Sequence, residues 1–133
     1  MVLRDHVGSI IFCSCRHLPS CDDVLETEIL AIKEDLMLAS QWSSLPIDIE
    51  SDCFEAVKMV QSEGSNRSKY AFLVEEIKKN LSERNSCIIH IRRCQNLASH
   101  VMANFERSQA RTAVWLGSGP EEVIDIVRRD CNT

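Results

Sequence analysis

Apolar residues recur at helical spacing from Asp23 to about Trp42, which predicts a long amphipathic helix. Ser20 or Asp22 is expected to cap its start. Shorter patterns of the same kind predict helices over Cys53 to Gln61, Ser68 to Leu81, Gln95 to Phe105 and Glu121 to Cys131. The apolar stripe of the long helix consists of Leu25, Ile29, Ile32, Leu36 and Ala39, broadened by Leu30 and Met37.

Short β-type runs alternate with these helices. Residues 1–4 and 9–16 are expected to form a hairpin around Asp5 to Gly8, where Gly8 can take the positive φ that the turn needs. Further strands are predicted at 47–51 and 87–91, and the apolar segment 111–117 is predicted to be extended. The 133 residues suit one α/β domain.

Two carboxylates stand out against this pattern. Asp52 directly follows the strand at 47–51, and in open α/β sheets ligands gather at the carboxyl ends of strands. The alternative is structural, because Asp52 followed by Glu55 is a serviceable capping box. Glu28 borders the apolar stripe of the long helix, so its carboxylate must be paired, solvated through a cleft or bound to a metal.

The net charge of −5 conceals an uneven distribution. Residues 1–65 carry 4 basic and 12 acidic side chains, whereas residues 66–111 carry 9 and 4. An acidic centre beside a basic flank suits a metal site next to a phosphate backbone, although a solvated helix face has the same composition. Within the basic part, a strand delivers Arg92 and Arg93 to its end, which indicates either a phosphate clamp or a charged strand terminus.

Seven cysteines are an odd number, and Met1 leads into charged residues rather than an apolar signal segment. We therefore expect reduced thiols and an intracellular protein, in the nucleus or the cytoplasm. A zinc cluster is the alternative, but its spacing fits no common site. Its members would be Cys13, Cys15, Cys21, His6 and His17. No run of 18 apolar residues predicts a membrane span.

Five segments together resemble the reverse-transcriptase-like RNase H domains that are abundant in plant genomes and often derive from retroelements. They read RDHVGSIIFCSC, ETEILAIKEDLMLA, IDIESDCFEAVKMVQ, IIHIRRCQNLASHVMA and RTAVWLGSGPEEV. The resemblance covers nearly the whole chain. It implies the ribonuclease H fold, a mixed sheet flanked by helices, with residues 1–106 as the RNase H-like domain and residues 107–133 as a C-terminal extension with a short helix.

The resemblance also implies an activity. Members of the family are endonucleases that cut the RNA strand of an RNA–DNA hybrid, with four carboxylates holding two Mg²⁺ ions. Hard oxygen ligands suit Mg²⁺, and Mn²⁺ is the other candidate cofactor. The helix carboxylate corresponds to Glu28 and the strand-end carboxylate to Asp52. The nucleic acid would lie along Arg92 and Arg93, with Asn96 helping to orient it.

The sequence departs from the family in two places. The family's first, central strand, with its metal-bridging Asp, is expected to precede Met1, so the chain resembles an N-terminally truncated member. Asp5 is no substitute, because it lies at the hairpin turn. The last carboxylate of the family corresponds to His100, whose imidazole suits Zn²⁺ or Mn²⁺ better than Mg²⁺.

Two of four metal carboxylates are therefore identifiable, and we expect feeble activity or none. The leading hypothesis is a nucleic-acid-binding domain of ribonuclease lineage. The alternative is a non-catalytic module that binds nucleic acid or protein. Without the central strand its neighbours would expose unpaired edges, so self-association through those edges is expected as a remedy, and no membrane partner is expected.

Overall fold

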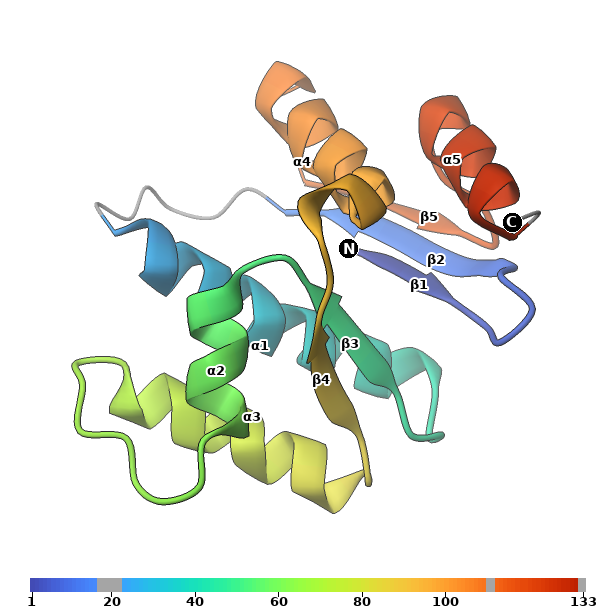
Figure 1. Ribbon diagram of the computed structural model, residues 1–133. Coiled ribbons are helices and arrows are strands. Elements are labelled where there is room, and N and C mark those ends of the chain that lie inside the picture. The colour runs from blue at the N-terminus through green and yellow to red at the C-terminus, as the bar shows by residue number, and fades with distance from the viewer. Residues whose placement is uncertain (17–22, 110–111, 132–133) are drawn as a thin grey trace. The chain divides into compact units, whose positions relative to one another are not determined.

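The computed structural model describes residues 1–16, 23–109 and 112–131. The chain forms two compact units, which are shown in Figure 1 and described separately here. Unit 1 comprises Met1–Pro19 and Cys94–Thr133, and unit 2 comprises Ser20–Arg93. Unit 2 is thus inserted between the two segments that form unit 1.

Unit 1 is an antiparallel sheet with helices on one face. Its strands β1 (Val2–Arg4), β2 (Ile10–Cys15) and β5 (Ala113–Leu116) lie in the order β1-β2-β5. The predicted hairpin is confirmed, and Gly8 has a φ of 85° at its turn. Helices α4 (Leu97–Gln109) and α5 (Glu121–Cys131) lie over the same face of this sheet (Figure 1).

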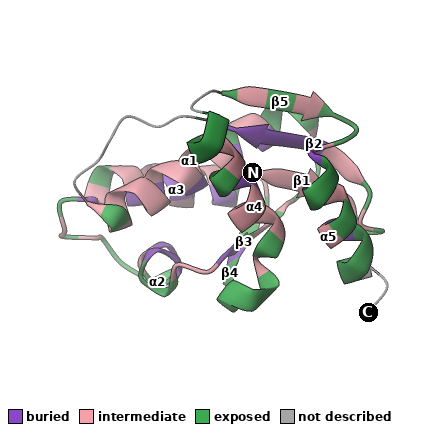
Figure 2. Cartoon of the chain, turned by 90° about the horizontal axis from the view of Figure 1, so that it is seen from above, coloured by how far each residue is buried: buried purple, intermediate pink, exposed green. Residues whose placement is uncertain are grey.

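The core of unit 1 is built from small and flexible side chains. Cys13 and Cys15 of β2 pack with Met102 of α4 and with Val123 and Val127 of α5. Figure 2 shows the buried character of β2. Burial raises the pKa of the Cys13 thiol to about 11. The two thiols are therefore core residues, whereas His17 and Cys21 of the zinc alternative lie outside the described residues.

Gly119, between β5 and α5, makes the closest approach to this core. A Cβ added there would lie 2.8 Å from the sulfur of Cys13 and 3.7 Å from a methyl carbon of Val123. Contacts under 3.0 Å are essentially never made by real Cβ atoms. The absence of a side chain at Gly119 thus lets the chain enter α5 directly over β2.

Unit 2 packs three helices against a pair of parallel strands. The helices are α1 (Val24–Trp42), α2 (Phe54–Gln61) and α3 (Ala71–Glu83), and the strands are β3 (Asp48–Ser51) and β4 (Cys87–His90). The register runs from Asp48 opposite Cys87 to Ser51 opposite His90. The short 3₁₀ helix Arg93–Gln95 follows β4.

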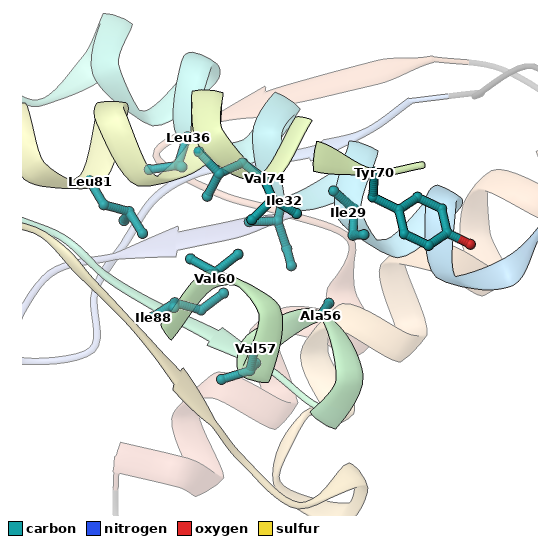
Figure 3. Close-up of a cluster of buried hydrophobic side chains, with 11 residues drawn as sticks. Ile29, Ile32, Leu36, Ala56, Val57, Val60, Tyr70, Val74, Leu81 and Ile88 are labelled. Carbon is teal, nitrogen blue, oxygen red and sulfur yellow. The ribbon is translucent and has the colours of Figure 1, made fainter. Parts of the chain in front are cut away.

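The core of unit 2 is aliphatic, and its side chains point toward one another from all three helices and from β4 (Figure 3). Ile29, Val74 and Ile77 are fully buried. The stripe predicted for the long helix is largely confirmed, because Ile29, Ile32, Leu36 and Ala39 are buried, but Met37 is 47% exposed and does not broaden it. Helical periodicity and burial therefore agree along most of α1.

The start of α1 is fixed by a polar cluster. Asp23 is the N-cap and accepts a hydrogen bond from the N–H of Leu25 at 3.0 Å. The prediction that Ser20 or Asp22 caps this helix is wrong, and both residues lie outside the described ones. The ammonium of Lys69 lies 2.7 Å from the Asp23 carboxylate, and the Tyr70 hydroxyl donates to it as well. Lys69 first, and then Tyr70, lower the pKa of Asp23 to about 2.

The start of α3 differs from the prediction by three residues. The Asn66 carboxamide oxygen accepts hydrogen bonds from the N–H and the hydroxyl of Ser68, and the Ser68 hydroxyl accepts from the N–H of Tyr70. These local bonds hold the backbone in a turn and compete with helix formation. The helix accordingly begins at Ala71 rather than at Ser68.

The amino ends of β3 and β4 are tied together by polar groups. The Arg84 guanidinium donates to the carbonyls of Ser43 and Leu45, and its bond to Leu45 measures 2.8 Å. The N–H of Ile47 donates to the Ser86 hydroxyl at 2.8 Å. These bonds fix the segment that leads from α1 into β3.

The described residues form a mixed α/β structure of the RNase H-like type, as expected. Its antiparallel strands lie in one sheet and its parallel strands in another. Among the described helices, none has both the length and the apolar character that a membrane span requires.

Candidate functional site

The carboxyl ends of β3 and β4 form one edge of unit 2. Ser51 lies opposite His90, and the N–H of Ile91 donates to the Ser51 carbonyl at 3.0 Å. Asp52 and Arg92 follow directly after these paired residues. Because parallel strands end at the same edge, the backbone positions of Asp52 and Arg92 both lie at this edge.

Glu28 and Asp52 both act on the thiol of Cys53, whose pKa is raised. Burial raises the pKa of Cys53, and the negative charges of Glu28 and Asp52 add to the rise, while the N–H of Ala56 opposes it. Two carboxylates from α1 and from the end of β3 therefore act on one sulfur atom. Both carry half-buried side chains.

The N-cap position of α2 differs from the capping-box alternative. Cys53, not Asp52, is the N-cap residue of this helix. The Ser51 hydroxyl instead accepts from the N–H of Cys53 at 3.2 Å. The strand thus ends one residue before Asp52 and the helix begins two residues after it, so Asp52 lies in the connection between them.

An exposed aromatic side chain begins α2. Phe54 has the helical spacing of an apolar stripe, yet it is 56% exposed. Its ring centroid lies 5.5 Å from that of the exposed His90. Apolar periodicity assigns Phe54, the first residue of the helix, to the same face as Val57 and Val60. It therefore does not distinguish the exposed Phe54 from these two buried residues.

The two arginines predicted as a phosphate clamp are exposed, with Arg92 in the connection after β4 and Arg93 opening the 3₁₀ helix. The remaining predicted residues, Asn96 and His100, belong to unit 1. The N–H of His100 in α4 donates to the Asn96 carbonyl at 3.1 Å, and both side chains are half-buried. The structure thus brings Glu28, Asp52 and the arginines into unit 2.

The donor set of this edge fits a hard divalent cation only in part. Mg²⁺ is commonly held by one or two carboxylates together with substrate phosphates, and Glu28 and Asp52 offer such a pair. Across residues 1–16, 23–109 and 112–131, no group of three or more His, Cys, Asp and Glu side chains is arranged to hold a metal ion. A cation held by these two carboxylates would need further ligands, such as phosphate oxygens.

Comparison with known proteins adds one finding. The model of a family described as reverse transcriptase-like matches residues 1–106, which include all elements from β1 to most of α4. No curated protein and no solved structure matches the chain.

Proposed function

Because the chain belongs to the reverse transcriptase-like family, whose fold is RNase H-like, we propose that it binds nucleic acid through the carboxyl edge of β3 and β4. One observation carries the proposal. Asp52 and Arg92 leave the same edge of a parallel strand pair whose register runs to Ser51 and His90. A guanidinium group binds phosphate, and a nearby carboxylate pair can take a cation that the phosphate shares.

The roles of the residues follow from their chemistry. Arg92 and Arg93 bind the phosphate backbone as bidentate donors. Glu28 and Asp52 would hold Mg²⁺, or Mn²⁺, which when bound polarises a phosphoryl oxygen and lowers the pKa of a bound water. The substrate is an RNA–DNA hybrid. Cleavage of its RNA strand is slow, because only two of the four metal-binding carboxylates that the resemblance implies are identifiable. The protein acts inside the cell.

A second function is a non-catalytic module that binds nucleic acid. The imidazole of His100 favours it, because this side chain stands where the resemblance implies a carboxylate, and a neutral imidazole is a poor ligand for Mg²⁺. The two functions share the binding surface and differ in whether the RNA strand is cut.

Labelled RNA–DNA hybrid, incubated with Mg²⁺ and then with Mn²⁺, tests both functions. We expect the chain to bind the hybrid and to cut it slowly, and we expect the Asp52→Asn variant to bind without cutting. Glu55→Gln is the matched control, because Glu55 is an exposed carboxylate in the first turn of α2. Binding without cleavage would establish the non-catalytic module, and failure to bind nucleic acid would overturn both.

A further inference from the structure

Phe54 and His90 form an exposed aromatic pair in unit 2. Their ring centroids are 5.5 Å apart and their planes meet at 83°, the edge-to-face geometry that aromatic pairs prefer. Phe54 remains 56% exposed in this arrangement. The contact with His90 holds the phenyl ring in place without covering it, so a fixed aromatic surface faces the outside.

The pair lies at the edge already assigned to phosphate binding. Phe54 follows Asp52 by two residues, and His90 precedes Arg92 by two residues. His90 is also the residue opposite Ser51 in the strand register. An aromatic surface, a carboxylate and exposed guanidinium groups thus occur within three residues of the ends of β3 and β4.

This combination selects one kind of ligand. Guanidinium groups that follow the same strand attract a polyanion, and rings that offer an open face stack nucleobases irrespective of their identity. A base inside a duplex has both faces covered by its neighbours, so it cannot stack on a protein ring. Only a base at a frayed end or in a single-stranded overhang offers a face.

We propose that Phe54, supported by His90, stacks an unpaired nucleobase next to the bound phosphate, so that this edge prefers hybrids that carry a single-stranded overhang. The inference rests on the proposed function and adds to it the class of substrate. Phe54 is the residue that contacts the base, and His90 is a positioning residue that holds the phenyl ring.

The test compares two ligands that differ only in their bases. One is a short RNA–DNA hybrid with a single-stranded overhang, and the other is the same hybrid with abasic sites throughout the overhang. Both present the same phosphates at the same salt concentration. Phe54→Ala removes the ring, and Phe72→Ala is the matched control, because Phe72 of α3 is 79% exposed in the same unit.

We expect the chain and the Phe72→Ala variant to bind the overhang with bases about tenfold more tightly than the abasic one. Phe54→Ala should bind both equally, at the affinity of the chain for the abasic overhang. His90→Asn should reduce the preference without abolishing it. Circular dichroism checks that each variant is folded. A Phe54→Leu variant, which keeps apolar bulk but has no aromatic face, should also lose the preference.

Other outcomes overturn the inference in distinguishable ways. Equal affinity of the chain for the two overhangs would refute base stacking and leave phosphate binding intact. A Phe54→Ala variant that lost the same affinity for both ligands would also refute it, because the loss would not depend on bases. No binding of either ligand would refute the proposed function and this inference with it.

Discussion

The two ends of the β3–β4 strand pair use polar side chains in different ways. At the amino end, Arg84 and Ser86 direct their polar groups at the backbone that enters β3, and the Cys87 thiol donates to the Asp48 carboxylate at 3.0 Å. At the carboxyl end, Phe54 and Arg92 are exposed. Polar side chains at the amino end thus bond to other groups of the protein, whereas the carboxyl end exposes a charged and an aromatic side chain.

This difference predicts which measurement each substitution changes. Substitutions at the amino end should lower the free energy of unfolding and leave nucleic-acid affinity unchanged. Substitutions at the carboxyl end should lower nucleic-acid affinity and leave the free energy of unfolding unchanged.

Arg84→Ala should lower the free energy of unfolding by about 2 kcal/mol, because the carbonyls of Ser43 and Leu45 lose charge-assisted hydrogen bonds. Denaturant titration measures the change. Lys79→Ala is the control, because Lys79 makes only a long, exposed contact of 3.9 Å with Glu83, and its removal should cost less than about 0.5 kcal/mol. Similar losses in both variants would contradict a structural role of the amino end.

Replacing both Arg92 and Arg93 with alanine should weaken nucleic-acid binding about tenfold and reduce its salt dependence, because two phosphate contacts are lost. Binding titrations at several salt concentrations measure both quantities. Arg67→Ala, which removes an exposed arginine from the connection between α2 and α3, is the control for net charge. An equal loss in that control would show that binding follows overall charge and not this edge.

Asp52→Asn should abolish stabilisation by Mg²⁺. A cation that binds only the folded protein raises its free energy of unfolding by about 1 kcal/mol at a few times its dissociation constant. Thermal unfolding with and without Mg²⁺ measures this, and Glu55→Gln should keep the response. A persistent response in Asp52→Asn would place the cation elsewhere.

The smallest effect concerns Asp23, a carboxylate that serves the fold and so contrasts with Asp52. Its pKa falls from 3.8 to about 2 on folding, so the folded protein binds fewer protons than the unfolded chain between these values. Stability from Asp23 is therefore fully present above pH 3.8 and is lost as the pH falls toward 2.

The Asp23→Asn variant should consequently be less stable than the parent chain above this window, and the difference should shrink within it. Denaturant midpoints across the acid range measure the difference. Asparagine can still cap α1, so the variant isolates the charge that pairs with Lys69. A difference that stayed constant with pH would contradict the assignment.

Local patterns in the sequence were sufficient to predict the elements of the fold. Apolar spacing predicted α1 and α2 nearly to their ends, and the run before Asp52 predicted β3. The pairing of β5 with β2 was not predicted, since Phe12 and Leu116 lie opposite each other but far apart in the chain. Periodicity reports which face of an element is apolar and does not report which element covers it.

The site was predicted in part for the same reason. Glu28 and Asp52 stood out because a carboxylate beside an apolar stripe or at a strand end needs an explanation. The action of both carboxylates on the Cys53 thiol and the contact of Phe54 with His90 depend on how α1, α2 and β4 pack together. No spacing in the sequence encodes that packing.

The insertion of unit 2 within unit 1 has a consequence for how the chain folds. Unit 2 is formed by one continuous stretch of the chain, residues 20–93, whereas the sheet of unit 1 must join Cys15 to Ala113. Closing so long a loop costs little more free energy than closing a shorter one, but contacts of such sequence separation form slowly. During synthesis, unit 2 can therefore fold on the ribosome before β5 is available to pair with β2.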